Sequence, residues 1–248
     1  MGKRILQRRR GKGGMQFRVP PKGKIAAVRY PNLRTEGEEK LVVKAILDEK
    51  GRSAPLAQLE QGSGEISYIP AVSGLVVGSH IGLGPSAAPS NGNILPLLSI
   101  PEGTRISNIE LRVGDGGKLV RASGGSAVLF SKGNGRAILR LPSGKSILVD
   151  DKCRASIGEI AGGGRLDKPF MRAGPRHHAM KAQGRMYPRM RGIAMAVVYH
   201  PFGGGRHQHP GKSTSTSRNA PPGRKVGLIA PRKTGRSRLA RTSTEVKK

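Results

Sequence analysis

Cysteine, aromatic and large apolar residues are scarce in this 248-residue chain. The single cysteine, Cys153, excludes an intrachain disulfide and a cysteine-based zinc finger, and it fits a reducing cytosolic compartment. Trp is absent, aromatic residues make up 3% and hydrophobic residues 35% of the chain. Together with 37 Gly and 18 Pro, this composition favours small β-rich domains with tight turns over one thick core.

Long apolar segments are missing as well. No stretch approaches the roughly 20 apolar residues that span a bilayer. The basic N-terminus, MGKRILQRRRGKGG, lacks the apolar region of a signal peptide, and Leu6 stands where myristoylation requires Ser or Thr. The sequence therefore predicts a cytoplasmic protein with no membrane-spanning segment.

Acidic residues are few, and their distribution divides the chain. There are 15 Asp and Glu against 45 Lys and Arg, which gives a net charge of +30 and implies a polyanionic partner. Residues 1–24 hold nine cations and no acid, and residues 165–248 hold twenty cations and two acids. The middle, with sixteen cations and thirteen acids, is nearly balanced. We expect a folded middle between two basic arms that become ordered on a polyanion, either nucleic acid or an acidic membrane surface.

The middle of the chain shows two series of strand-like runs separated by turn residues, with Pro85–Asn93 (PSAAPSNGN) as a linker between them. Connectors such as Gly-Asp-Gly-Gly and Gly-Asn-Gly suit tight turns, and a short, regular spacing is typical of small barrels or sandwiches. We therefore predict two small β-barrels in series. The expected strands span residues 40–47, 55–59, 65–72 and 75–77, then 94–100, 106–113, 119–122, 127–132, 136–141 and 146–149.

The segment His200–Gly211, HPFGGGRHQHPG, raises two chemical alternatives, a metal site and a phosphate-binding loop, and Cys153 raises a third, nucleophilic catalysis. His207 and His209 could approach a metal, but the segment has no carboxylate or thiolate ligand. A phosphate-binding loop would need glycine five residues before Gly211, where Arg206 stands. Cys153 lies at the end of a β series, and a free cysteine there most often behaves as a small buried hydrophobe. No metal site and no catalytic residue are therefore predicted.

Phosphate binding by the arms is the best-supported chemistry. Gly and Pro interrupt the cations, which prevents long helices and suits extended peptides lying between RNA helices. A structural protein of a large ribonucleoprotein is favoured over a DNA-compacting or membrane-surface protein, so no membrane partner is predicted. The remaining alternative is that the arms are solvated, disordered basic tails. The predicted RNA-binding residues are Arg4, Arg8, Arg9, Arg10, Lys12, Arg18, Arg185, Arg189, Arg191, His200, Gly203, Gly204, Gly205, Arg206, His207, His209, Lys212, Arg224, Lys225, Arg232, Lys233 and Arg236.

Several stretches together carry a family resemblance. They are GNILPLLSIPEGT (Gly92–Thr104), GDGGKLVRASGG (Gly114–Gly125), LRLPSGK (Leu139–Lys145), CRASIGEIAGGGRLDKP (Cys153–Pro169), RMRGIAMAVVYHPFGGGRHQHPGK (Arg189–Lys212) and GRKVGLIAPRKTGR (Gly223–Arg236). The chain resembles the universal large-subunit ribosomal protein two family, in its archaeal or eukaryotic form, over essentially its whole length. The resemblance is weakest before about residue 40.

The resemblance implies a mainly β fold with four parts. A basic N-terminal extension (1–34) precedes an OB-fold-like RNA-binding barrel (35–88), an SH3-like barrel (89–165) and an extended basic C-terminal arm (166–248). It implies binding to large-subunit rRNA and neighbouring ribosomal proteins, and contact with the small subunit at an intersubunit bridge. The implied role is structural support of subunit association, tRNA binding and the peptidyl-transferase region.

The resemblance also bears on catalysis. His200 falls on a histidine once proposed to be catalytic in the family, and Phe202 stands where the bacterial pattern has a second histidine. Because the neighbours of His200 in sequence provide no obvious base or orienting acid, we expect no enzymatic activity. We expect no homo-oligomer and no cofactor apart from Mg or K ions of the surrounding rRNA.

Overall fold

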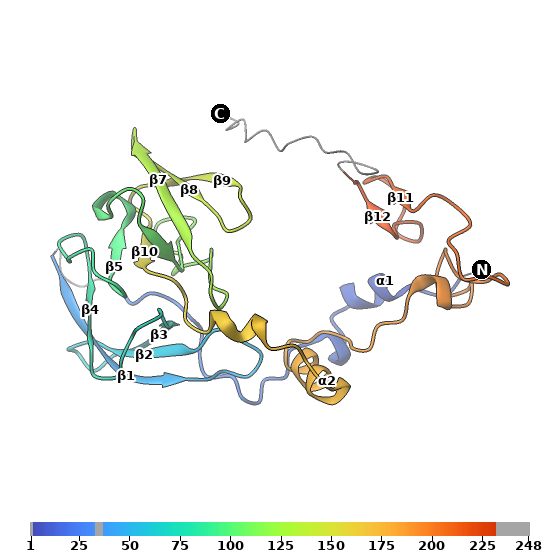
Figure 1. The fold of residues 1–248 in the computed structure, drawn as a ribbon, viewed down its shortest axis with the longest axis horizontal. Coiled ribbons are helices and arrows are strands. Elements are labelled where there is room, and N and C mark those ends of the chain that lie inside the picture. Colours follow the sequence, from blue (N-terminus) through green and yellow to red (C-terminus); the bar gives the residue numbers. More distant parts are fainter. Residues whose placement is uncertain (1, 33–36, 232–248) are drawn as a thin grey trace. The chain divides into compact units, whose positions relative to one another are not determined.

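The computed structural model describes residues 2–32 and 37–231, which form two compact units (Figure 1). The β unit comprises the described residues of Lys22–Pro169. The arm unit combines residues 2–21 with residues 170–231, so it brings the two ends of the described chain together. Arg232, Lys233 and Arg236, three of the predicted RNA-binding residues, lie outside the described residues.

The first module of the β unit is built around one long central strand. Its strands are β1 (Glu39–Leu47), β2 (Leu56–Glu60), β3 (Ile66–Pro70) and β4 (His80–Leu83). β1 pairs antiparallel with both β2 and β4, and β2 pairs with β3. Alternation in β1 points Leu41 and Val43 inward, where they join Leu59, Ile69 and Ile81 in a fully enclosed apolar core. Period-two patterning therefore builds this module.

The second module continues the same sheet. Its elements are β5 (Ile94–Pro96), a 3-10 turn (Leu97–Ser99), β6 (Arg105–Ser107), β7 (Ala127–Gly133), β8 (Arg136–Arg140), β9 (Ser146–Asp150) and β10 (Arg154–Ile157). The strand order is β5-β10-β6-β7-β8-β9, and a single parallel pair, Leu83 with Ile94, links β4 to β5. Asn134 and Gly135 both have positive φ in the β7–β8 turn, as the Asn-Gly pair predicts. The module has its own core around Ile106, Leu129 and Leu139.

The arm unit has little regular structure and a very small core. Its elements are α1 (Leu6–Gly11), α2 (Ala173–Ala182), 3-10 turns at Met15–Phe17 and Gly192–Ala194, and the paired strands β11 (Ser215–Thr216) and β12 (Leu228–Ile229). Its core consists of Ile5, Phe202 and Val226, against which the half-buried Ile193 packs. The unit is held by a contact between residues about 220 positions apart in the chain.

The structure confirms the predicted mainly β fold, in which an OB-fold-like and an SH3-like module accompany basic arms. Most strands lie where they are expected, but residues 75–77 lie in a loop and β4 begins only at His80. Two expectations in the second module are wrong: β6 ends at Ser107 instead of reaching residue 113, and residues 119–122 form no strand, only an isolated bridge from Leu119 to Ile109. The strand β10 was not expected, because RASI is short and half polar. The exact domain boundaries stay a prediction. Tyr30, from the expected N-terminal extension, is buried in the core of the first module.

Met190–Tyr199 (MRGIAMAVVY), an apolar stretch of the C-terminal arm, is largely exposed. Met190 is 63% and Val197 66% exposed, and only Ile193 packs against the core of the arm unit. The core of the arm unit comes from single apolar residues in three separate segments, which no local run of apolar residues reveals. Among the described residues, no helix is long and apolar enough to span a membrane.

Candidate nucleic-acid interface

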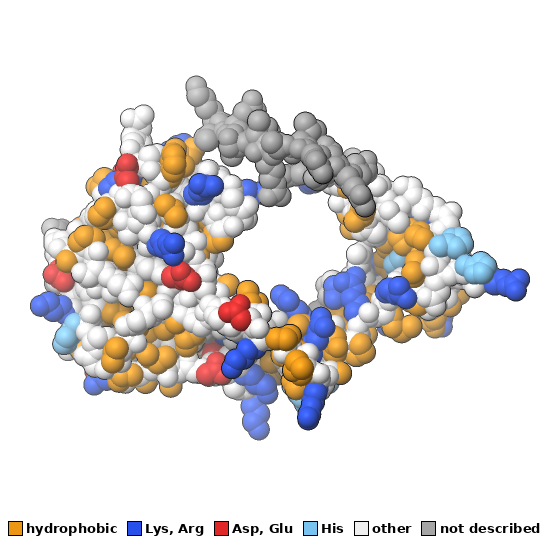
Figure 2. Space-filling view, viewed as in Figure 1, with side chains coloured by type: hydrophobic (Ala, Val, Ile, Leu, Met, Phe, Trp, Pro, Cys, Tyr) orange, Lys and Arg blue, Asp and Glu red, His pale blue; other side chains and the backbone are white. Residues whose placement is uncertain are grey.

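The arm unit contains no acidic residue in its described part. Residues 2–21 hold seven Lys and Arg, and residues 170–231 hold eleven, with no Asp or Glu in either range. In Figure 2 blue side chains are visible on both units, whereas the red acidic side chains are visible on the β unit alone. The described cations of this unit have no carboxylate of their own unit to neutralise them, so they remain available to an external polyanion.

Several acids of the β unit form ion pairs with cations of the same unit. Glu49 lies 3.1 Å from Lys24 and 2.6 Å from Arg52, and Glu60 lies 2.6 Å from Lys44. Burial by itself would raise the pKa of Glu49, but hydrogen bonds from Arg52 and Lys24 outweigh it and lower this pKa below its ordinary value. Part of the positive charge of the β unit is therefore neutralised internally.

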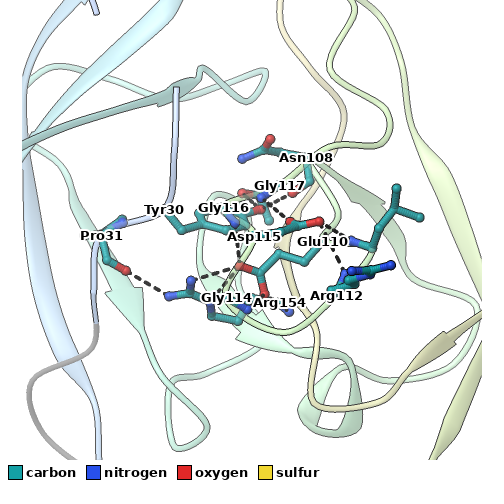
Figure 3. A network of polar contacts seen from close by, with 12 residues as sticks. Tyr30, Pro31, Asn108, Glu110, Arg112, Gly114, Asp115, Gly116, Gly117 and Arg154 are labelled. Carbon is teal, nitrogen blue, oxygen red and sulfur yellow. Dashed lines mark hydrogen bonds and ion pairs between the residues drawn. The ribbon is translucent and has the colours of Figure 1, made fainter. Parts of the chain in front are cut away.

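A buried polar network in the β unit joins the segment before β1 to the second module (Figure 3). The fully buried carboxylate of Glu110 accepts hydrogen bonds from the backbone and the guanidinium of Arg154, each at 2.9 Å. Arg154 also donates to the carbonyl of Pro31 at 2.8 Å, and the Tyr30 hydroxyl donates to the carbonyl of Asn108 at 2.6 Å. Burial raises the pKa of Tyr30 far above its ordinary value, so its hydroxyl stays protonated. These groups hold the fold together.

The predicted cations of the described arm unit are almost all on the surface. Arg4, Arg8, Arg9, Arg10, Lys12, Arg18, Arg185, Arg189, Arg191, Arg206, Lys212 and Arg224 are exposed, and Lys225 is half-buried. Within the described residues, only two of them donate side-chain hydrogen bonds: Arg18 to the carbonyl of Gly13 (2.6 Å) and Arg191 to Gln208 (3.4 Å). The guanidinium groups thus keep most of their donors free for phosphate oxygens.

The segment His200–Gly211 forms turns and bends, as its composition predicts. A Cβ at Gly203 would meet the backbone carbonyls of Met195 and Ala196, so glycine is required there for packing within the arm unit. Contact of Gly203 with RNA stays a prediction. The Gly204 N–H donates to the carbonyl of Met195 at 3.0 Å, and the φ of +83° at Gly204 is one that glycine adopts readily.

Beyond the glycines, the segment presents its charged and aromatic groups to solvent. Gly205 is exposed with a φ of +86°, and Arg206, His207, His209 and Lys212 follow it as exposed residues. The described residues contain no group of three or more His, Cys, Asp and Glu side chains placed to hold a metal ion. The exposed end of the segment is suited to stacking on bases and to hydrogen bonding with phosphates.

His200 lies at the inner end of this segment and is half-buried. Its Nδ1 accepts a hydrogen bond from the Phe202 backbone N–H at 3.1 Å, which places the proton of the neutral ring on Nε2. Burial, and then the positive charge of Arg189, lower the pKa of His200 below 6.5. No carboxylate of the described arm unit orients the imidazole. His200 is thus a neutral hydrogen-bond donor at neutral pH.

Cys153 does not form a reactive site. Its side chain is fully buried in the core of the second module. Burial raises the pKa of its thiol to about 11, and the nearby carboxylates of Glu110 and Asp150 act in the same direction. Because the thiolate is the nucleophilic form, this residue is a small core hydrophobe, as its sequence context predicts.

The sequence alone did not reveal a cavity in the arm unit beside His200. It has a volume of about 380 Å³ and is lined by Leu6, Arg9, Met186, Arg189, Met190, Ala194, Met195, Ala196, Tyr199 and His200. Of the predicted site residues, the cavity brings together Arg9, Arg189 and His200, but not the residues from Gly205 to Lys212. Lys3, a further cation of the N-terminal arm, places its ammonium 5.5 Å from the Tyr199 ring centre.

Comparisons with known proteins identify the family to which this chain is similar. Residues 90–226 match the family model described as Ribosomal Proteins L2, C-terminal domain. A relative from Cenarchaeum symbiosum is 48% identical over 239 residues, covering 96% of this chain and 98% of the relative. Relatives from Desulfurococcus amylolyticus and Hyperthermus butylicus are 49% and 50% identical, covering 95% of this chain and 99% of each relative. All three are named large ribosomal subunit protein uL2.

Proposed function

The chain belongs to the ribosomal protein L2 family, and from that premise we propose that it is a structural, non-catalytic constituent of the large ribosomal subunit. Its relatives have an archaeal origin, in keeping with the archaeal or eukaryotic form that the sequence predicts. In this proposal the arm unit binds large-subunit rRNA, and the β unit supplies the stable body from which the arms extend. The protein acts in the cytoplasm as part of the ribosome.

The observation that carries the proposal is the unneutralised charge of the arm unit. Its described residues hold eighteen Lys and Arg without one Asp or Glu. A surface of this kind releases counterions when it binds phosphates, and that release drives association. The short elements of the unit, with glycine and proline between them, give it the irregular backbone that suits gaps between RNA helices.

Finer roles follow from the family resemblance and are part of the proposal. The protein would support subunit association, form a bridge to the small subunit, and support tRNA binding and the peptidyl-transferase region. Each of these roles requires the protein to bind and position RNA, and none requires it to catalyse a reaction. The geometry of His200 favours this view, because its described surroundings lack the acid that would orient a general base.

The test is binding of the full chain to large-subunit rRNA over a range of salt concentrations. With roughly 6–10 phosphate contacts, affinity should fall about 10³- to 10⁵-fold between about 50 and 200 mM salt. Co-sedimentation with large subunits at low and high salt provides the assembled counterpart. An affinity for rRNA that is independent of salt, or equal affinity for double-stranded DNA, would contradict the proposal.

A further inference from the structure

We propose that the cavity beside His200 is a binding pocket for a single nucleobase extruded from an RNA helix. The inference rests on the proposed function, because it names the chemical group of RNA that the arm unit receives there. Most of the exposed cations, which the proposed function assigns to phosphates, lie outside the lining of this cavity. Three properties of the cavity support it: its apolar walls, the cations on its lining and the free donor of His200.

The cavity walls are mostly apolar and incompletely covered. Met186, Met190 and Met195 line it with Tyr199 and two alanines. Met190 is 63% and Tyr199 45% exposed, although Phe202 nearby is only 7% exposed. A volume of about 380 Å³ is near the lower limit for small-molecule pockets, which suits one planar ring system. Methionine side chains adapt their shape and make favourable contacts with aromatic rings.

Charge at the cavity restricts its occupant to one that is both apolar and anionic. Arg9, from α1, and Arg189, before the turn at Gly192–Ala194, both line it and are exposed. No carboxylate of the described arm unit neutralises them. A nucleotide combines a flat, largely apolar base with a phosphate, so it matches both parts of the site. An apolar side chain of another protein would fill the walls but leave the two guanidinium groups unpaired.

His200 adds a directional group to the cavity. With Nδ1 occupied by the Phe202 N–H, Nε2 carries the hydrogen, and it has no hydrogen-bond partner in the described part of the chain. The backbone of Gly192 packs directly against the imidazole, so that any Cβ at this position would displace the ring. His200 is therefore held in place as a donor toward an acceptor atom on the edge of a base or on its phosphate.

The experiment uses the full chain and two RNA hairpins that differ in one nucleotide. One hairpin carries a single bulged purine, and the other carries an abasic nucleotide at the same position. Base stacking in protein sites contributes about 1–3 kcal/mol, so the native chain should prefer the bulged purine by about 5- to 140-fold. In Ala194→Leu the added side chain occupies the cavity, and this preference should disappear.

A matched control separates the cavity from the rest of the arm unit. Ala173→Leu introduces the same side chain at an exposed position at the start of α2, outside the cavity lining, and should keep the preference. All three proteins should show the same dependence of affinity on salt, because none has lost a cation. An equal slope also shows that Ala194→Leu has retained the phosphate-binding surface.

Each other outcome has a definite meaning. Equal affinity of the native chain for the two hairpins, or an equal loss of preference in both variants, overturns the pocket while the proposed function stands. If the variants bind RNA like the native chain but Ala194→Leu impairs incorporation of another ribosomal protein, the occupant is a protein side chain and the inference is wrong. Failure of the native chain to bind either hairpin or rRNA at low salt rejects the proposed function itself.

Discussion

The β unit and the arm unit carry similar numbers of cations but differ in what lies around them. Residues 22–169 contain twenty Lys and Arg with fourteen Asp and Glu, whereas the described arm unit has no acid. The β unit encloses two apolar cores, and the arm unit buries Ile5, Phe202 and Val226. The β unit neutralises part of its positive charge with its own carboxylates and is stabilised by its apolar cores. The arm unit does not neutralise its cations and gains counter-charges from a partner.

The difference extends to how each unit uses its polar side chains. Glu110 and Arg154 form an ion pair in the interior of the β unit. The guanidinium of Arg154 also lies over the ring of Tyr30, whose hydroxyl is hydrogen-bonded to Ser156. In the arm unit, Lys3 lies over Tyr199 and Arg176 lies 5.0 Å from the Tyr187 ring centre, so aromatic faces take part of the role that carboxylates have elsewhere. Cation–π contacts leave the charge of the cation intact. The comparison therefore separates cations that serve the fold from cations that serve binding.

The largest expected effect tests the internal neutralisation in the β unit. Glu110→Gln keeps the shape of the side chain but leaves the guanidinium of Arg154 without its carboxylate. We expect the free energy of unfolding of the β unit to fall by about 3–5 kcal/mol, measured by urea denaturation. Affinity for rRNA in conditions where the protein stays folded should be nearly unchanged.

Glu60→Gln is the matched control for that variant. Its partner Lys44 is 52% and Glu60 itself 32% exposed, so loss of this pair should cost only about 0–1 kcal/mol. If the two variants lowered the free energy of unfolding equally, burial of the Glu110–Arg154 pair would not make it more stabilising than the exposed Glu60–Lys44 pair.

The second prediction tests the open charge of the arm unit. Replacing Arg206, Lys212 and Arg224 together by Gln removes three exposed cations that do not line the cavity. Each phosphate contact contributes about 0.7–0.9 to the slope of log affinity against log salt, so at about 0.1 M salt the affinity for rRNA should fall by roughly two to three powers of ten. Filter binding across a salt series measures both quantities.

The corresponding change in the β unit replaces Arg136, Arg140 and Lys145, which are also exposed. We expect a smaller change in the slope. If the two triple variants lose the same affinity for rRNA, the proposal that the arm unit makes most of the phosphate contacts is wrong, and RNA contacts extend over both units.

The third prediction concerns the small core of the arm unit. Phe202→Ala removes the largest buried side chain of its three-residue core, which should weaken the unit locally by about 1.5–3 kcal/mol. Hydrogen exchange should report this at the Lys3 amide, which donates to the carbonyl of Val198 at 2.9 Å. Amides of β2 should keep their protection. Val197→Ala, at a position 66% exposed, serves as the control and should change neither region.

The smallest expected effect depends on pH. The pKa of His200 is lowered in the folded chain, so the unfolded chain takes up the proton more readily. The contribution of His200 to stability is therefore present above pH 6.5 and is lost as pH falls toward the lowered pKa. Protonation also removes the acceptor for the Phe202 N–H, so protection of that amide should decrease on acidification. His200→Asn should abolish the dependence, and protection that rises on acidification would refute it.

Local patterns predicted the β unit well because each strand depends on nearby residues. Arg136–Arg140 (RAILR) alternates, and its inward Ala137 and Leu139 are fully buried. The Asn-Gly turn before it fixes the pairing of β7 with β8. β4 was misplaced because Val76 and Val77 look like strand residues but lie exposed in a turn closed by the Ser79 N–H and the carbonyl of Val76.

The arm unit was predictable in its charge but not in its shape. α2 was missed because AGPRHHAMKA shows no apolar period, and among its described residues only Ala182 is buried. The cavity depends on Leu6 and Arg9 meeting residues 186–200, and no local pattern encodes that meeting. The predicted cations and His200 were selected by residue type alone, and their role in RNA binding stays a prediction.

The contact of Ile5 with Phe202 and Val226 imposes an order of events on synthesis. The ribosome makes Ile5 about 220 residues before Val226, an interval on the order of 10–45 s at usual elongation rates. The strands of the β unit are complete before Phe202 has been made. The β unit is therefore free to fold while Ile5 still lacks its apolar contacts with Phe202 and Val226. During this interval residues 2–21, with seven Lys and Arg and no acid, lack the apolar contacts that Phe202 and Val226 later supply.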